Sequence, residues 1–177
     1  MTNTQLTHDN HSPTNQKLPL CFLAHDIDDP LNIGSLFRIA DALGVTKIFL
    51  TGSTVVPPNP KIKKTSRSAE RHVDYELMES PLVVINRLKN SGYRIISLEI
   101  TNASRDIRKL TVQPSDKICL VLGSESKGVN QTLLDQSDLT IHIPMLGNNS
   151  SMNVANAAAI ATFEISKELT TTEIQGH

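Results

Sequence analysis

The sequence predicts an α/β domain with a mainly parallel sheet and helices on both faces. Two observations predict it. Short apolar runs of strand length alternate with segments whose apolar residues recur at helical spacing, and several of these runs are continuous, as in strands that are buried on both faces. The 177 residues are enough for one domain with a hydrophobic core.

The elements follow from the chain in order. Apolar runs predict strands at residues 20–27, 47–51, 73–77, 94–99, 117–122 and 139–143. Helical spacing predicts helices at residues 34–43, 81–90, 128–134 and 154–169. Pro81 at a first helical position and Gly92 beyond the last one mark the ends of the second helix. Residues 1–18 and 170–177 are polar and without period, so we expect two disordered tails around one domain at residues 19–169.

Composition excludes several classes of protein. Charged residues make up 20% of the chain and hydrophobic residues 38%, which rules out wholesale disorder. No apolar run approaches the roughly 18 residues of a membrane span, and the polar start is not a secretory signal. We therefore expect a cytoplasmic protein without membrane contact. Cys21 and Cys119 lie apart within apolar runs, which predicts buried free thiols and no metal site.

The net charge of −1 hides a local excess of cations. Residues 61–71 hold one anion, Glu70, and five cations: Lys61, Lys63, Lys64, Arg67 and Arg71. This stretch therefore carries +4 and the remaining residues together carry −5. Such a run is typical both of a solvated surface and of a surface that binds nucleic-acid phosphates, and the sequence leaves both readings open.

Three loops follow predicted strands, where ligands bind to parallel sheets. They are residues 28–34, 123–128 and 144–152, and all are rich in Gly, Asn, Ser or Pro. In the first loop, Asn32 can cap a helix and Arg38 can be a surface residue near Asp41. Alternatively, Gly34 lets a ligand approach the backbone with the Arg38 guanidinium beside it, which suits a phosphate or a ribose.

The second loop resembles a phosphate-binding loop only in part. Gly123 and Gly128 are five apart, but Val129 and Asn130 stand where a P-loop needs Lys and Ser or Thr. This argues against nucleoside triphosphate chemistry, and no G-x-G-x-x-G follows any strand. A strand-to-helix turn accounts for both glycines, which leaves Glu125 without an evident structural task.

The third loop leads into the last predicted helix. Ser151 or Asn153 can cap this helix, and the small residues 155–159 permit close approach of another backbone. The amides and carbonyls of such a loop can also line an adenine pocket, which composition alone does not establish.

Three motifs in this order carry a resemblance that covers residues 20–169. They are Asn32-x-Gly34-x-x-x-Arg38, then Leu122-Gly123-Ser124-Glu125-x-x-Gly128, then Ile143-Pro144-Met145 with Ser151-Met152-Asn153-Val154. Together they resemble the motifs of the SpoU (TrmH-like) family of the SPOUT superfamily. Members of this family are S-adenosylmethionine-dependent RNA 2′-O-ribose methyltransferases. The resemblance implies a C-terminal deep trefoil knot that holds the methyl donor, and a homodimer whose subunits both contact RNA.

The resemblance also implies roles for single residues. Arg38 would be the catalytic arginine, and Asn32 would position Arg38 or the ribose. Glu125 and Asn153 would shape the active site, with Ser151 against donor or substrate. Mainly backbone contacts to the donor would come from Leu98, Gly123, Ile143 and Met152. Ala155 stands where many relatives have Ser, so no hydroxyl role is expected there.

The chemistry and the substrate can be narrowed further. Arginine stays protonated at neutral pH, which favours Arg38 as an electrostatic stabiliser of a developing alkoxide over Arg38 as a general base. The short N-terminal tail leaves no separate RNA-binding domain, which favours tRNA over rRNA as the substrate. The six aromatic residues favour recognition by shape and backbone over base stacking. An rRNA substrate, a non-catalytic RNA-binding protein and a flavodoxin-like enzyme remain alternatives.

Overall fold

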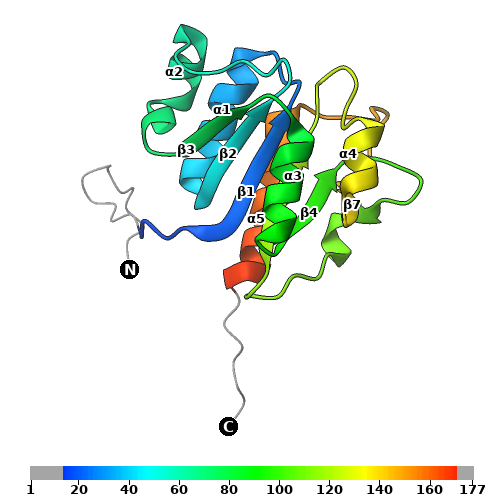
Figure 1. Ribbon diagram of the computed structural model, residues 1–177. Coiled ribbons are helices and arrows are strands. Elements are labelled where there is room, and N and C mark those ends of the chain that lie inside the picture. The colour runs from blue at the N-terminus through cyan, green and yellow to red at the C-terminus, as the bar shows by residue number, and fades with distance from the viewer. Residues whose placement is uncertain (1–13, 171–177) are drawn as a thin grey trace, which may run out of the picture.

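A seven-stranded sheet forms the centre of the structure, a computed structural model that describes residues 14–170 (Figure 1). The strand order is β3-β2-β1-β6-β4-β7-β5, and all pairs of neighbouring strands are parallel. The predicted mainly parallel sheet is therefore confirmed. The strands are β1 Leu18–His25, β2 Val45–Thr51, β3 Asp74–Met78, β4 Tyr93–Leu98, β5 Arg105–Asp106, β6 Lys117–Leu122 and β7 Leu139–His142.

Helices cover both faces of the sheet. They are α1 Pro30–Ala42, α2 Pro60–Ser66, α3 Pro81–Asn90, α4 Gln131–Gln136 and α5 Val154–Thr170, with 3-10 turns η2 Ala69–Arg71 and η3 Ile107–Lys109. Helices α1 and α5 share one hydrophobic core with the sheet, and α2 packs on α1. Helices α3 and α4 share the core on the opposite face. Within residues 14–170 no helix is long and apolar enough to cross a membrane.

Strand β1 shows how the sequence builds both cores. Side chains alternate between the faces of a strand, so Phe22 points into the core of α1 and α5, and Leu23 points into the core of α3 and α4. Cys21 lies beside Cys119 in the parallel register, and both thiols are free and buried, as predicted. A hydrogen bond with Cys21 and burial raise the pKa of the Cys119 thiol well above its usual range.

Several predicted boundaries shift for identifiable reasons. Helix α1 begins at Pro30 instead of residue 34, because the Asp29 carboxylate accepts a hydrogen bond from the Leu31 amide at 2.9 Å and caps the helix. The interpretation of Asn32 as the cap is therefore wrong. Helix α4 begins at Gln131 instead of residue 128, because Gly128 has a φ of +64° and belongs to the preceding turn. The short strand β5 and η3 lie between the strands predicted at 94–99 and 117–122, where no element was predicted.

The predicted tails fall mostly on residues outside the described range. Residues 1–13 and 171–177 are not described. Leu18, which the first tail was expected to include, is the first residue of β1, and Thr170 is the last residue of α5.

Gly34 has a packing role. A Cβ atom at this position would lie 2.7 Å from the Ile62 carbonyl oxygen and 2.7 Å from Thr65 Cβ, both on α2. The missing side chain thus allows α2 to lie close against α1. The expectation that Gly34 admits a ligand is replaced by this contact between helices.

Candidate active site

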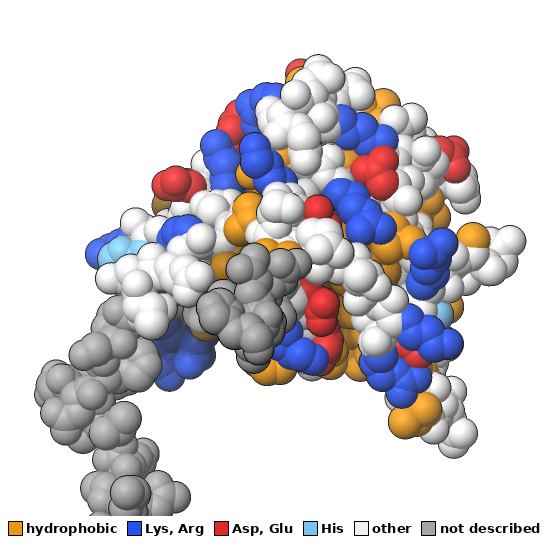
Figure 2. Space-filling model, turned by 90° about the horizontal axis from the view of Figure 1, so that it is seen from below, with side chains coloured by type: hydrophobic (Ala, Val, Ile, Leu, Met, Phe, Trp, Pro, Cys, Tyr) orange, Lys and Arg blue, Asp and Glu red, His pale blue; other side chains and the backbone are white. Residues whose placement is uncertain are grey.

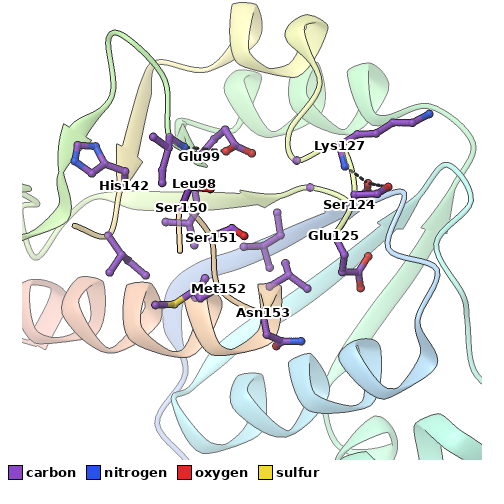
Figure 3. A pocket seen from close by; sticks show the side chains of 18 of the residues that line it. Leu98, Glu99, Ser124, Glu125, Lys127, His142, Ser150, Ser151, Met152 and Asn153 are labelled. Atoms are coloured by element: carbon purple, nitrogen blue, oxygen red, sulfur yellow. Dashed lines mark hydrogen bonds between the residues drawn. The ribbon is translucent and has the colours of Figure 1, made fainter. Parts of the chain in front are cut away.

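A cavity of about 610 Å³ opens at the carboxyl ends of β4, β6 and β7 (Figure 3). Its walls come from the loop after β6 and from the segment that joins β7 to α5. This is the edge of the sheet that the sequence predicted for a ligand site. The predicted donor-binding residues all line the cavity: Leu98, Gly123, Ile143, Ser151 and Met152.

The loop after β6 folds back on itself. Ser124 and Gly128 pair through two backbone hydrogen bonds of 3.1 and 2.8 Å, and the Lys127 amide donates to Ser124 Oγ at 3.0 Å. A Cβ atom on Gly123 would lie 2.2 Å from the Gly128 carbonyl oxygen, so only glycine fits there. The glycines of this motif therefore close a tight turn, and the turn projects Glu125 away from the strand.

Glu125, Asn32 and Asn153 form a chain of hydrogen bonds between three distant segments. Asn32 Nδ2 donates to Glu125 Oε1, and Asn153 Nδ2 donates to Asn32 Oδ1 at 2.8 Å. Glu125 and Asn153 line the cavity on the side next to α1, and the Asn32 side chain is buried beneath them. The structure thus brings together three of the predicted site residues.

The helix cap of α5 sets the direction of this chain. Asn153 Oδ1 accepts hydrogen bonds from the Ala155 amide at 3.0 Å and the Asn156 amide at 3.2 Å, as one of the two predicted caps. Because this oxygen faces two N–H donors, the Asn153 amide nitrogen must face Asn32. Asn32 then presents its carbonyl oxygen to Asn153 and its amide nitrogen to Glu125. The cap therefore orients the carboxylate at the cavity wall.

Ser151 lies at the cavity, whereas Ala155 lies in the hydrophobic core. Ser151 is exposed and lines the cavity. The Ala155 side chain is 4% exposed and belongs to the core of α1 and α5. A methyl group is well placed in that core, which is consistent with the expectation that no hydroxyl acts at this position.

Arg38 lies apart from this chain. It is exposed on α1 and does not line the cavity. Arg38 follows Gly34 by about one helical turn, so it lies at the edge of the α1 face that α2 covers. Within residues 14–170 its guanidinium has no ion pair, and the proposed neighbour Asp41 does not form one with it.

The cationic stretch is exposed along α2, the turn after it and η2. We call it the basic surface, and its members are Lys61, Lys63, Lys64, Arg67 and Arg71, all of them exposed. Glu70 is turned inward, with its side chain 11% exposed, and accepts a hydrogen bond from Ser66 Oγ. That hydrogen bond and the nearby cations hold the pKa of Glu70 below its usual value.

The face at the amino ends of the strands carries mixed charge. Figure 2 views the molecule from below, at the amino ends of the strands, where Lys and Arg side chains lie among Asp, Glu and apolar side chains. The basic surface differs because its single carboxylate is largely buried. Its cations therefore face solvent without an exposed carboxylate among them.

The cavity has the composition of a nucleoside-type site. Leu98, Ile143 and Met152 supply apolar walls, and a half-buried carboxylate, Glu99, adds hydrogen-bond acceptors. These residues fit a ligand with a flat apolar base and polar hydroxyl and amino groups. Sequence reasoning missed Glu99, although its position directly after a buried strand was a usable signal.

The fold and the cavity define a class: a parallel α/β protein with a cavity beyond the carboxyl ends of its central strands, where ligands bind in sheets of this kind. The model of the SpoU rRNA Methylase family matches residues 19–163. The chain belongs to this family, as the three motifs predicted.

Relatives and solved structures agree with this assignment. An uncharacterized tRNA/rRNA methyltransferase of Borreliella burgdorferi is 33% identical over 147 residues, which are 83% of this chain and 63% of that protein. The chain thus spans less than two thirds of that relative. The SpoU methyltransferase AviRb of Streptomyces viridochromogenes, solved with its cofactor AdoMet, matches with a TM-score of 0.78 and 25% identity over 88% of this chain and 62% of that one.

A third match is similar in length to this chain. It is a structure that gives insight into the 2-OH methylation of C/U34 on tRNA, with a TM-score of 0.76 and 26% identity. The match covers 85% of this chain and 96% of that chain.

Proposed function

We propose that the protein is an S-adenosylmethionine-dependent methyltransferase that methylates a ribose 2′-OH of RNA, with tRNA favoured over rRNA. The observation that carries the proposal is the hydrogen-bond chain from Asn153 through Asn32 to Glu125, at the wall of a cavity lined by the second and third motifs. A non-catalytic RNA-binding protein would have no need to orient these three side chains.

Different residues bind the donor, align the substrate and stabilise the developing charge. S-adenosylmethionine supplies an electrophilic methyl group. Leu98, Gly123, Ile143, Ser151 and Met152 form the walls that hold the donor. Glu125, held in one orientation by Asn32, accepts a hydrogen bond from the substrate and so aligns it. A ribose hydroxyl is a weak nucleophile at neutral pH, and Arg38 stabilises the negative charge that develops on its oxygen. As the O–CH3 bond forms, the S–CH3 bond of the donor breaks, S-adenosylhomocysteine leaves and the hydroxyl proton passes to solvent.

The proposal is tested by methyl transfer to RNA. The purified protein should transfer a tritiated methyl group from S-adenosylmethionine to a tRNA pool, and the modified position should resist alkaline cleavage, as a 2′-O-methylated ribose does. Transfer to ribosomal RNA and not to tRNA would identify the alternative substrate. Donor binding without transfer to either RNA would contradict the proposal, and ribose-methylation maps from cells with and without the gene would identify the nucleotide.

The preference for tRNA has one main support. It is the likeness to the structure concerned with the 2-OH methylation of C/U34 on tRNA, which is matched over 96% of that chain. Because RNA is the proposed substrate, we also propose a cytoplasmic location.

We expect the basic surface to contact RNA phosphates. Replacing Lys63, Lys64 and Arg67 with Gln should make the slope of log K against log salt about 2 to 3 units less steep, because each lost phosphate contact removes about one unit. Filter binding of tRNA at several salt concentrations measures this slope.

The matched control removes three exposed cations elsewhere. Lys17, Arg105 and Lys109 are exposed and lie outside α2 and η2. Replacing these three with Gln lowers the net charge by the same amount and should change the slope by less than the first variant does. Equal slopes for the two variants would show that only net charge matters, and would remove the basic surface from the RNA interface.

We also propose the homodimer and the trefoil knot that the family resemblance implies. Support for the dimer comes from exposed apolar side chains on the neighbouring helices α1 and α5: Leu31 is 47% exposed, Ile160 41% and Phe163 55%. Sedimentation velocity of the 19.4 kDa chain measures the mass directly. Support for the knot comes from membership of the SpoU family.

A further inference from the structure

Two carboxylates line the cavity among the described residues, Glu99 and Glu125, and only Glu125 belongs to the three motifs. Glu99 directly follows the last residue of β4, and its backbone amide donates to the Ile141 carbonyl oxygen of β7 at 2.9 Å. Figure 3 shows it beside Leu98, on the opposite side of the cavity from Glu125. The two carboxylates therefore face different parts of a bound ligand.

The loop after β6 is shaped around the Glu99 side chain. Oε2 accepts a hydrogen bond from the Val129 amide at 2.8 Å, and Oε1 accepts one from the Ile100 amide at 2.9 Å. A Cβ atom on Gly128 would lie 2.1 Å from Glu99 Oε2. The second glycine of the motif thus leaves room for this carboxylate, which is held in one position from two sides.

The charge of Glu99 is not neutralised by a cation. Within residues 14–170, no Lys, Arg or His lies within ion-pair distance of its oxygens. A carboxylate offers about four acceptor positions, and the two backbone amides occupy two of them. A half-buried carboxylate that lines a ligand cavity is stabilised by further donors. A pair of adjacent hydroxyl groups would supply two, one for each remaining acceptor position.

We propose that Glu99 binds the two ribose hydroxyls of S-adenosylmethionine and so positions the nucleoside in the cavity. In dinucleotide-binding sheets an acidic side chain accepts a hydrogen bond from a ribose hydroxyl, which is a precedent for this kind of contact. This inference rests on the proposed use of S-adenosylmethionine. Glu99 takes no part in the transfer itself; it selects a donor that carries both hydroxyls.

The experiment measures binding of donor analogues by calorimetry, without RNA. The probes are S-adenosylhomocysteine, its 2′-deoxy and 3′-deoxy forms, and 5′-methylthioadenosine, which keeps the ribose but lacks the amino-acid part. The wild-type protein should bind each deoxy form ~10- to 100-fold more weakly than the parent compound, because each lacks a hydrogen bond to a charged acceptor.

Glu99→Gln should bind S-adenosylhomocysteine at least ~10-fold more weakly. The deoxy penalty, which is the Kd of a deoxy form divided by the Kd of the parent compound, should fall below ~3-fold. The variant should also bind 5′-methylthioadenosine more weakly, by the same factor as S-adenosylhomocysteine. Glu125→Gln is the matched control, because it neutralises the other cavity carboxylate and should leave the deoxy penalties unchanged.

The outcomes separate this inference from the proposed function. Wild-type protein that binds all three homocysteine compounds equally overturns the role of Glu99, whatever the variants do, and leaves the donor assignment standing. A Glu99→Gln variant that keeps the full deoxy penalties also overturns it. If that variant weakens S-adenosylhomocysteine but not 5′-methylthioadenosine, Glu99 binds the ammonium group and the inference is wrong. Failure of the wild-type protein to bind any of the probes overturns the proposed function itself.

Discussion

Arg38→Ala is expected to lower the rate of methyl transfer ~10²- to 10³-fold and to leave the affinity for S-adenosylmethionine unchanged. Loss of one donor that faces a developing negative charge typically has an effect of this size. Arg38 does not line the cavity, so donor binding should not depend on it. The measurements are initial rates with a tritiated methyl donor and Kd values from calorimetry.

The matched control is Arg38→Lys, which keeps the charge and loses the planar guanidinium. A rate between those of wild type and Arg38→Ala would show that charge and geometry both contribute. Arg38 is exposed and has no ion pair within residues 14–170. The free energy of unfolding of both variants should therefore stay within about 0.5 kcal/mol of the wild-type value. Unchanged turnover in Arg38→Ala, with the protein folded, would remove Arg38 from the reaction.

The sequence predicted elements best where local signals agree. Helix α3 was predicted at residues 81–90 and spans Pro81–Asn90, because Pro81 is suited to a helix start and Gly92 to the turn after the end. Strand β6 was predicted with the same bounds, 117–122, because a continuous apolar run is bounded by a charged residue and by glycine. The two-residue strand β5 has no such pattern and is formed only by its pairing with β7.

The candidate site was predictable in its composition and less so in its geometry. The three motifs predicted Asn32, Glu125 and Asn153 as site residues, and two hydrogen bonds connect their side chains in the structure. The role of Gly34 depends on Ile62 and Thr65, which are distant in sequence, and no local pattern reports such a contact. Glu99 had a local signal, its place at the end of a buried strand, but its hydrogen bond to the Val129 amide depends on the turn formed after β6.

Asn153→Asp is expected to lower the methyl-transfer rate ~10²-fold with little loss of stability. An Asp carboxylate still accepts hydrogen bonds from the Ala155 and Asn156 amides, so the cap of α5 is kept. It cannot donate to Asn32 Oδ1, and it faces that oxygen with negative charge. Asn32 then turns its amide nitrogen toward residue 153 and its oxygen toward Glu125, which releases the carboxylate from its aligned position, and misplacement by about 1 Å can cost ~10² in rate.

Asn153→Ala separates the two roles of this side chain. It removes the cap as well as the donor, so it should lose activity to a similar extent and also lower the free energy of unfolding by ~1 kcal/mol in urea titrations. If only stability falls and the rate of the Asp variant stays near wild type, Asn153 is a helix cap and nothing more. If both variants are inactive and only the Ala variant is destabilised, the same amide group caps α5 with its oxygen and orients Glu125 through its nitrogen, which is why an asparagine fits this position better than the serine or aspartate that would cap the helix equally well.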